Sequence, residues 1–322
     1  MADIPNRRTG LRASEILPKV DYLKFTVLGS ALQRMPEFMS SAIAVGVCEV
    51  MARRRSGPQA LARAHLQRVL ESSSPVAPVD PAILRRWSRR AFRSYAHYWV
   101  DGARLPTTPQ EKIERRFVFE RGFNNLEEGM AAGRGVIMAI PHVGSWEWGG
   151  AVLAFTGYPM TSVAERLEPP ELFEWFIDQR RAMGLTIVPL GGDSSRQVLQ
   201  TLKAGGLVGL LCDRDLMGNG VEVELFGERT TLPAGPATLA LRTGARLLPT
   251  AVYSGPGRHH HAVIEAPVDL RREGSLRQDV TRITQEVATR FEGFIRRSPD
   301  QWHLFQPNWP SEREAEEPKP AG

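Results

Sequence analysis

Apolar and polar residues alternate with two different periods along the chain, and the period changes near residue 105. Before that point apolar residues recur at three- and four-residue spacing over 21–55, 60–71 and 83–100, which predicts helices. We expect the first helical region to break at Pro36 and Gly46, and a Ser/Pro-rich connector at 72–81. Residues 1–105 are therefore predicted to form an N-terminal helical, membrane-proximal layer of the same domain as the residues that follow.

After that layer, short apolar runs alternate with helical patterns. Strands are predicted at 136–140, 161–164, 186–189, 207–211, 247–253 and 261–265, and helices at 146–155, 169–183, 194–203, 236–243 and 277–297. This alternation is typical of an α/β fold with a mostly parallel central sheet flanked by helices. We expect residues 106–310 to form that core, and the polar, Pro-rich residues 311–322 to form a disordered tail.

The composition narrows the class of protein. A hydrophobic content of 42% and a charged content of 24% over 322 residues are those of an ordinary globular protein. The net charge of +5 suits an anionic surface or a phosphorylated ligand, but it is too small to indicate nucleic-acid binding. The two cysteines, Cys48 and Cys212, lack metal-ligand spacing, so we expect buried, reduced thiols.

Membrane-spanning and secretory segments are not expected. No apolar run reaches the roughly 18 residues that a bilayer-spanning helix needs. The N-terminus lacks the charged-then-apolar order of a secretory signal. The sequence therefore predicts a soluble or peripheral protein on the cytoplasmic side.

The most informative segment follows the run at 136–140, where His142 is followed five residues later by Glu147. Active sites of open α/β sheets lie where strands end, and a histidine oriented by a carboxylate can act as a general base. Because positions five apart on one helix lie about 140° apart around its axis, the pair can meet only across a turn. Ser145 is the predicted N-cap of the helix that carries Glu147. The same pattern also fits a capped helix start with an incidental histidine.

Charged residues also end three later segments. The run at 161–164 is followed by Glu165 and Arg166, and the segment 222–228 ends in Glu228 before a turn into a helix. The run at 207–211 leads to three consecutive charged residues, Asp213, Arg214 and Asp215. One such segment is typical of an exposed loop. Three of them, in order after the His-x4-Glu pair, predict a polar site above an apolar floor.

Two other patterns do not indicate chemistry of their own. Three consecutive histidines at 259–261 follow a Gly-Pro-Gly turn, and neighbouring strand residues point to opposite faces, which makes them poor chelators. We expect a hairpin turn with solvated histidines there. The chain also lacks a Gly-x-Ser-x-Gly elbow, so a covalent acyl-serine intermediate is not expected.

Taken together, these segments resemble the lysophospholipid-type acyltransferases, and specifically their lipid A lauroyl/myristoyl branch. The resemblance covers about residues 30–310 and is carried by the segments that end the strands, by 232–249 and by 298–309. Within this branch the chain is most similar to the actinobacterial phosphatidylinositol mannoside acyltransferases, on segments 29–36, 53–55 and 212–228. The resemblance implies a fold like that of glycerol-3-phosphate acyltransferase.

The implied activity is transfer of a long-chain acyl group, palmitoyl, from acyl-CoA to a hydroxyl of a phosphatidylinositol mannoside. The family's enzymes need no metal or other cofactor, so acyl-CoA is the co-substrate. The implied partners are acyl-CoA, an anionic glycolipid or phospholipid, and the inner-leaflet surface of the membrane, which places the protein peripherally on its cytoplasmic face. The alternatives are a lysophospholipid or lipid A-type glycolipid acceptor, and a non-catalytic lipid-binding protein.

Catalytic roles are also implied by the resemblance. His142 would be the general base and Glu147 the carboxylate that orients it, with Asp213 as a further acidic contact. Glu228 is an alternative partner for the histidine. Backbone N–H groups at the helix start near Ser145 are expected to stabilise the oxyanion.

Substrate-binding roles fall on the other charged residues of these segments. Glu165 and Arg166 would line the acceptor site, and Arg180 would hold the acceptor's phosphate because a guanidinium binds it bidentately. The remaining candidates for substrate contact are Arg214, Asp215 and Ser145.

Overall fold

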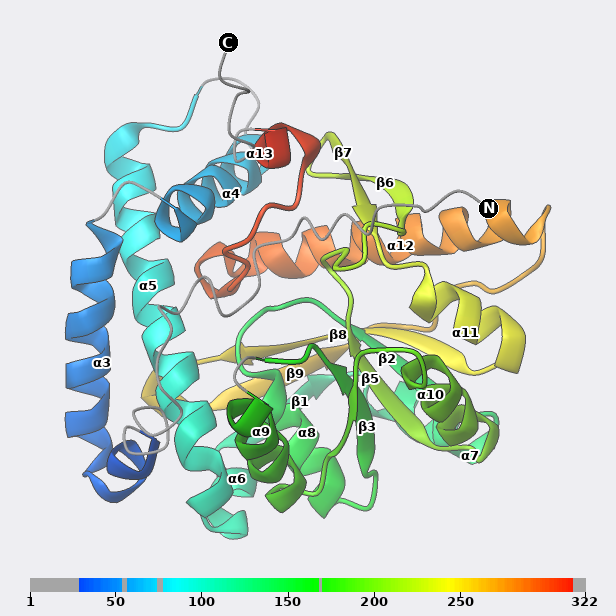
Figure 1. Ribbon diagram of the computed structural model, residues 1–322, viewed down its shortest axis with the longest axis horizontal. Coiled ribbons are helices and arrows are strands. Elements are labelled where there is room, and N and C mark those ends of the chain that lie inside the picture. The colour runs from blue at the N-terminus through cyan, green and yellow to red at the C-terminus, as the bar shows by residue number, and fades with distance from the viewer. Residues whose placement is uncertain (1–28, 54–56, 74–77, 168–169, 315–322) are drawn as a thin grey trace.

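A computed structural model describes residues 29–53, 57–73, 78–167 and 170–314 of the chain. Its centre is a seven-stranded sheet with helices on both faces, and a group of N-terminal helices stands at one side (Figure 1). The strands lie in the order β1 (Phe117–Arg121), β9 (His260–Ile264), β8 (Arg246–Ser254), β2 (Val136–Ile140), β5 (Leu207–Leu211), β3 (Met160–Ala164) and β4 (Thr186–Pro189). A separate antiparallel hairpin pairs β6 (Val221–Leu225) with β7 (Glu228–Leu232).

The sheet is mostly parallel, as the sequence predicts. Every neighbouring pair in it is parallel except β8 and β9, which run antiparallel. All five residues of β2 are buried, because both faces of a parallel sheet are covered and its strands are apolar throughout. The predicted strands are all present, and β2, β4 and β5 have the predicted bounds. The short edge strand β1 and the β6–β7 hairpin were not predicted.

Two helical layers enclose the sheet. One core cluster joins it to α10 (Ser194–Lys203), α11 (Gly235–Thr243) and α12 (Leu276–Arg297). The other joins it to α6 (Gln110–Arg115), α7 (Phe123–Ala131) and α8 (Trp146–Phe155). The start of α12 is fixed by a capping box, in which Ser275 and Gln278 exchange side-chain and backbone hydrogen bonds. Helix α9 (Pro170–Ala182) packs against β4.

The N-terminal layer consists of α3 (Glu37–Ala52), α4 (Pro58–Ser73) and α5 (Pro81–Arg104). A third apolar cluster holds these helices together and includes Phe305 from the C-terminal segment. The expected break at Gly46 is wrong, because α3 passes through that residue without interruption, whereas Pro36 does stand at its N-cap. Within the expected connector, residues 74–77 lie outside the described residues.

Short helices complete the chain: η1 (Leu105–Thr107), η2 (Pro256–Arg258), η3 (Pro299–Gln301) and α13 (Pro310–Glu314). Residues 311–314 were expected in a disordered tail, but they belong to α13, and Glu312 within it is buried. Burial of a carboxylate requires partners, which α4 supplies. Residues 315–322 of the expected tail lie outside the described residues. Among the described helices, none is long and apolar enough to cross a bilayer.

Candidate active site

Three neighbouring strands bring the predicted charged residues to one edge of the sheet. β5 lies between β2 and β3 and is parallel to both. The carboxyl ends of parallel strands meet at one edge, so the residues after β2, β5 and β3 are neighbours in space. Ile140 and Leu211 end β2 and β5 as register partners. His142 and Asp213 each lie two residues further along, which sets them face to face.

His142 and Asp213 form a close pair at this edge. The Nδ1 atom of His142 lies 2.5 Å from Oδ1 of Asp213, and the backbone N–H of His142 donates to Oδ2 over 2.9 Å. Asp213 is fully buried, while the His142 side chain is 32% exposed. A carboxylate can only accept, so Nδ1 carries the proton in the neutral ring and Nε2 is left as a free acceptor. The buried acid thus orients a histidine that remains accessible.

The carboxylate of Asp213 has a third donor, the indole Nε1 of Trp302, at 2.8 Å. Burial alone would raise the pKa of Asp213, but the charge and hydrogen bonds of His142 and the bond from Trp302 outweigh it and hold that pKa below its ordinary value. Asp213 is therefore charged, and it favours the protonated form of His142 during proton transfer.

The expected pairing of His142 with Glu147 is wrong. Glu147 lies in the first turn of α8 and is buried, and its Oε1 accepts hydrogen bonds from Tyr98 (3.1 Å) and Arg180 (3.2 Å). The sheet offers His142 a carboxylate from the neighbouring strand at closer range than the turn can offer one from the same segment. The His-x4-Glu spacing is therefore present, but its two members belong to different contacts.

Glu147 and Arg180 form a second polar group at the start of α8, and it is incompletely paired. The guanidinium of Arg180 lies 5.3 Å from the ring centroid of Trp146 and 5.5 Å from that of Phe176. Among the described residues, Oε2 of Glu147 and Nε of Arg180 are buried without a hydrogen-bond partner. Burial and the nearby Glu147 charge raise the pKa of Tyr98 well above its ordinary value, so the phenol stays protonated and donates.

The third strand end carries an ion pair. Arg214 donates from Nη2 to Oε2 of Glu165 over 3.1 Å, which links the loop after β5 to the end of β3. Burial lowers the pKa of the Arg214 guanidinium, and its Nε is a further buried atom without a partner among the described residues. Arg166, by contrast, is exposed and stacks loosely on Phe173 at 5.9 Å.

Two predicted acids lie in other surroundings. Asp215 accepts from the backbone N–H groups of residues 217, 218 and 220, so it shapes its own loop rather than contacting His142. Glu228 begins β7 and pairs with Arg68 at 2.7 Å and with Ser311 at 2.9 Å. The expectation of Glu228 as the histidine's partner is therefore wrong, because the β6–β7 hairpin stands apart from the central sheet.

The turn between His142 and α8 is tightly packed against β8. Gly144 has a φ of 62°, and a Cβ added there would lie 2.0 Å from the carbonyl oxygen of Val252, so only glycine fits. Ser145 occupies the predicted N-cap position, but its side chain bonds to Ser254 at 3.1 Å instead of capping the helix. The backbone N–H groups of Gly144 and Ser145 already donate to Gln301 and Val252. They are thus not free to stabilise an oxyanion, contrary to expectation.

The prediction for the three histidines is right only in part: a hairpin turn joins β8 to β9 and His259 at its end is exposed, but His260 is not solvated. His260 is in strand β9, fully buried, and stacked on Trp148 at 4.2 Å. Burial, with the nearby arginine charges, lowers its pKa to about 3, so the ring is neutral. A strand that pairs on both sides leaves no room for a solvated turn at this residue. No group of three or more metal-ligating side chains occurs among the residues that the structure describes.

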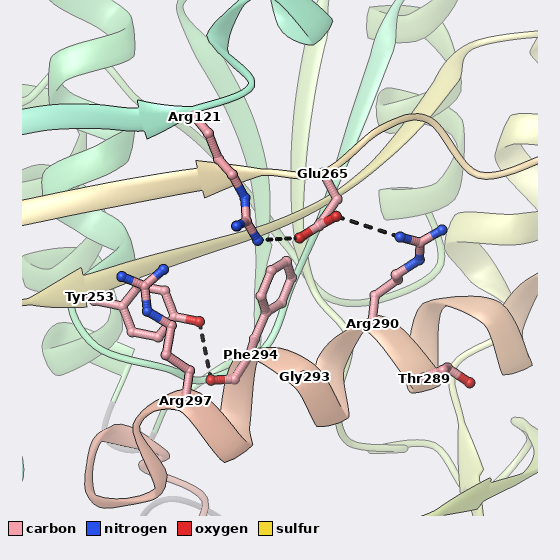
Figure 2. Close-up of a pocket in the computed structure, with 8 residues that line it drawn as sticks. All are labelled: Arg121, Tyr253, Glu265, Thr289, Arg290, Gly293, Phe294 and Arg297. Atoms are coloured by element: carbon pink, nitrogen blue, oxygen red, sulfur yellow. Dashed lines mark hydrogen bonds and ion pairs between the residues drawn. The ribbon is translucent and has the colours of Figure 1, made fainter.

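A pocket elsewhere on the sheet has no link to these residues. It lies between β1, β9 and α12 (Figure 2), and it is lined by Arg121, Tyr253, Glu265, Thr289, Arg290, Gly293, Phe294 and Arg297. Glu265 pairs with Arg121 at 2.7 Å and with Arg290 at 3.5 Å, and Tyr253 donates to the Phe294 carbonyl. Its remaining charged residue, Arg297, pairs with Glu120 beside the pocket at 2.7 Å. All four charged side chains of the lining are thus already paired, so the pocket does not compete with the His142 site as a candidate.

Sequence reasoning missed two residues of the site. Trp302 contacts Asp213, and Tyr98 contacts Glu147, from segments far away in the chain. Tyr98 lies in the predicted helix at 83–100 and Trp302 in a segment that carries the family resemblance, but no spacing rule connects either of them to His142. His303 is a further neighbour, since its backbone N–H donates to the His142 carbonyl over 2.8 Å.

Similarity to known proteins shows the family of this chain. Residues 15–311 match the family model described as bacterial lipid A biosynthesis acyltransferase. The chain belongs to this family. The predicted membership of the lipid A branch of acyltransferases is thereby confirmed.

Among curated members of this acyltransferase family, three similar proteins are named phosphatidylinositol mannoside acyltransferase. Two come from Mycobacterium tuberculosis: strain CDC 1551 / Oshkosh, 36% identical, and strain H37Rv, 37% identical, each over 286 residues. In both cases the match covers 87% of this chain and 85% of the relative. The third, from Mycolicibacterium smegmatis, is 35% identical over 86% of this chain and 88% of its own.

Proposed function

We propose that this acyltransferase moves a palmitoyl group from palmitoyl-CoA to a hydroxyl of a phosphatidylinositol mannoside. The observation that carries the proposal is the His142–Asp213 pair at the meeting edge of β2 and β5, in a chain whose curated relatives bear that name. The pair supplies the general base that ester formation needs, in a chain that belongs to a family of lipid acyltransferases.

The transfer is direct. Nε2 of His142 takes the proton from the acceptor hydroxyl as its oxygen attacks the thioester carbonyl, a contribution of roughly 10²–10⁴-fold. The carbon–sulfur bond then breaks, and the proton passes from His142 to the leaving CoA thiolate. Asp213 stays ionised and stabilises the imidazolium between these two steps. No residue becomes acylated, and no cofactor takes part besides acyl-CoA.

The acceptor is held by the two incompletely paired polar groups. The free Oε2 of Glu147 accepts from a sugar hydroxyl, and Arg180 with Arg214 supplies positive charge for the phosphodiester. Glu165, 31% exposed at the end of β3, completes the polar wall. The Ser145 hydroxyl is already bonded to Ser254, and the Asp215 carboxylate to N–H groups of its own loop, so we assign neither residue to the acceptor.

The test is release of free CoA thiol by purified full-length protein with palmitoyl-CoA and a panel of acceptors. The panel holds phosphatidylinositol mannosides, lysophospholipids and a lipid A precursor, with His142→Ala as the control. We expect thiol release that depends on the mannoside and is lost in the variant. Release with another acceptor would keep the chemistry and reject the acceptor. Absence of release with every acceptor would favour a non-catalytic lipid-binding protein.

We also propose that the protein works on the cytoplasmic face of the membrane, attached through α3. Apolar residues of α3 are exposed along one face: Phe38 (74%), Met39 (41%), Ile43 (50%), Val47 (56%) and Val50 (58%). Helix α5 packs on α3 (Figure 1). It exposes five arginines, at 85, 86, 89, 90 and 93. An apolar stripe beside clustered arginines suits the interface of an anionic bilayer.

Sedimentation with vesicles containing anionic lipid tests this attachment. Val50→Glu should weaken binding, and rising salt should weaken it further. Leu276→Glu is the matched control, because Leu276 is also an exposed apolar residue (41%) but begins α12, whose first turn lies away from α3 (Figure 1). Equal binding by both variants would exclude α3 as the membrane contact.

A further inference from the structure

Trp302 is the link between the catalytic edge and the C-terminal segment. Its indole N–H donates to Oδ2 of Asp213, the oxygen that also accepts the backbone N–H of His142. Asn308, from the same segment, donates to the Asp213 carbonyl over 3.2 Å. The segment around residue 302 therefore helps to enclose Asp213.

The indole ring is itself held by a buried aromatic cluster. Trp302 is 4% exposed, and its ring lies 5.3 Å from His65, 5.9 Å from Phe226 and 6.1 Å from Trp309. Its main chain bridges Val143, next to the catalytic histidine. The position of the N–H is thus fixed from both the ring and the backbone.

The cluster is anchored by an ion pair between the N-terminal layer and α13. His65 of α4 presents Nδ1 to the Leu304 carbonyl at 2.9 Å and Nε2 to Oε2 of Glu312 at 3.0 Å. Both partners are acceptors, so the ring can donate to both of them only in the form that carries a proton on each nitrogen. Arg68 also pairs with Glu312, with its Nη1 atom 2.7 Å from Oε1.

Glu312 ties the C-terminal segment to this ion pair. It also accepts the backbone N–H groups of Asn308 (3.0 Å) and Trp309 (3.3 Å), which closes the segment that carries Trp302. Burial would raise its pKa, but the bond to His65, with these N–H groups and Arg68, lowers it to about 2. The Glu312 carboxylate therefore stays charged at neutral pH.

We infer that Trp302 is a positioning residue for the His142–Asp213 pair, and that the buried His65–Glu312 ion pair holds Trp302 in place. The inference rests on the proposed function only for its kinetic readout. Its physical basis is that an N–H donated to a carboxylate lowers the proton affinity of that acid and of the histidine coupled to it. Without the donor, the pair binds its proton more tightly and the orientation of Asp213 is less fixed.

The test compares Trp302→Phe with Trp309→Phe. Both indoles are buried in the same cluster, but among the described residues Nε1 of Trp309 has no hydrogen-bond partner. Only the first variant therefore removes a bond to Asp213. We expect a loss of roughly 10- to 100-fold in kcat for Trp302→Phe, the effect of one hydrogen bond to a charged group. The acidic limb of its kcat/KM profile should move up by about half to one pH unit.

Trp309→Phe should lower thermal stability about as much as Trp302→Phe does, but its pH profile of kcat/KM should be unchanged. A profile of Trp302→Phe that coincides with that of Trp309→Phe would show a packing role only and would overturn the inference. If Trp302→Phe does not fold, Glu312→Gln serves in its place, since it breaks the anchor without touching the indole. It should move the profile in the same direction by a smaller step, and an unmoved profile would overturn the inference.

A second readout does not need activity. The His142 ring can be followed by NMR titration of the histidine-labelled full-length protein, with assignment by His142→Gln. We expect the His142 titration to shift to higher pH in Trp302→Phe and to stay in place in Trp309→Phe. If the wild type has no acyltransferase activity but this shift occurs, the proposed function fails while the inference stands. An unshifted titration rejects the inference whatever the activity.

Discussion

Asp213 and Glu147 are both buried carboxylates near His142, yet their surroundings differ in a way that separates their roles. Asp213 is fully buried and has three donors distributed over both oxygens. Glu147 has two donors on one oxygen, and the other oxygen is buried with no partner among the described residues. A buried carboxylate with donors on both oxygens serves the protein's own structure, whereas one with an unpaired oxygen can still accept a hydrogen bond from a ligand.

This difference also separates orientation from recognition. Asp213 reaches His142 from a neighbouring strand and fixes which ring nitrogen carries the proton. Glu147 is tied to Arg180 and Tyr98 on helices outside the sheet, where substrate can displace or join the contacts. We therefore expect substitutions of the two acids to affect different kinetic constants.

The largest effect is expected from Asp213→Asn. An amide in place of the acid no longer stabilises the imidazolium and favours the wrong tautomer of His142. We predict that kcat falls roughly 10²–10⁴-fold, the range of general-base catalysis. The measurement is thiol release under saturating acceptor, with circular dichroism as a check of folding. Retention of wild-type kcat would mean that another group orients the histidine.

Glu147→Gln should act on acceptor binding. The amide keeps an oxygen acceptor for Tyr98 but leaves Arg180 without its anionic partner, so the acceptor's contacts weaken. We predict a rise of about tenfold in KM for the acceptor, comparable to one lost hydrogen bond to a charged group. A matched measurement of KM for palmitoyl-CoA should show little change. If kcat instead falls as far as in Asp213→Asn, Glu147 acts on the base and the distinction drawn above is wrong.

The smallest effect is on stability, and it depends on pH. The pKa of Asp213 is held below the ordinary 3.8 in the folded state, so its ionised form stabilises the fold above that pH. This stabilisation is lost as pH falls below 3.8 toward the lowered folded-state pKa. We predict that Asp213→Asn lowers the free energy of unfolding by about 1–3 kcal/mol at pH 7, and that the gap to wild type narrows in acid. Urea unfolding at a series of pH values measures this, and a gap independent of pH would contradict the prediction.

Much of the fold could be predicted from local pattern. Buried parallel strands such as Leu207–Leu211 are apolar throughout and bounded by turns, so their position follows from short windows of sequence. The edge strand β1 was not predicted, because Val118 is exposed and the strand is only half covered. His260 was misplaced because its burial depends on Trp148 from α8, a contact that no local pattern encodes.

Part of the site could also be predicted from the sequence. Strand ends identified His142, Asp213, Glu165 and Arg214 as neighbours, since the order of parallel strands brings their carboxyl ends together. Which acid faces the histidine was not predictable from spacing, because it depends on the register of β2 with β5. Trp302 enters from a segment 89 positions after Asp213, beyond any sequence rule.

The distance between Asp213 and Trp302 has a consequence for synthesis of the protein. The acid leaves the ribosome well before the indole that completes its pairing, and Glu312 emerges later still. Folding during translation proceeds from the N-terminus. The nascent chain therefore contains His142 and Asp213 before it contains Trp302 and Asn308, which bury and bond the acid. The base is assembled in its final form only when the last segment docks on α4. An unfinished polypeptide thus carries the histidine before its acid partner has all of its hydrogen bonds.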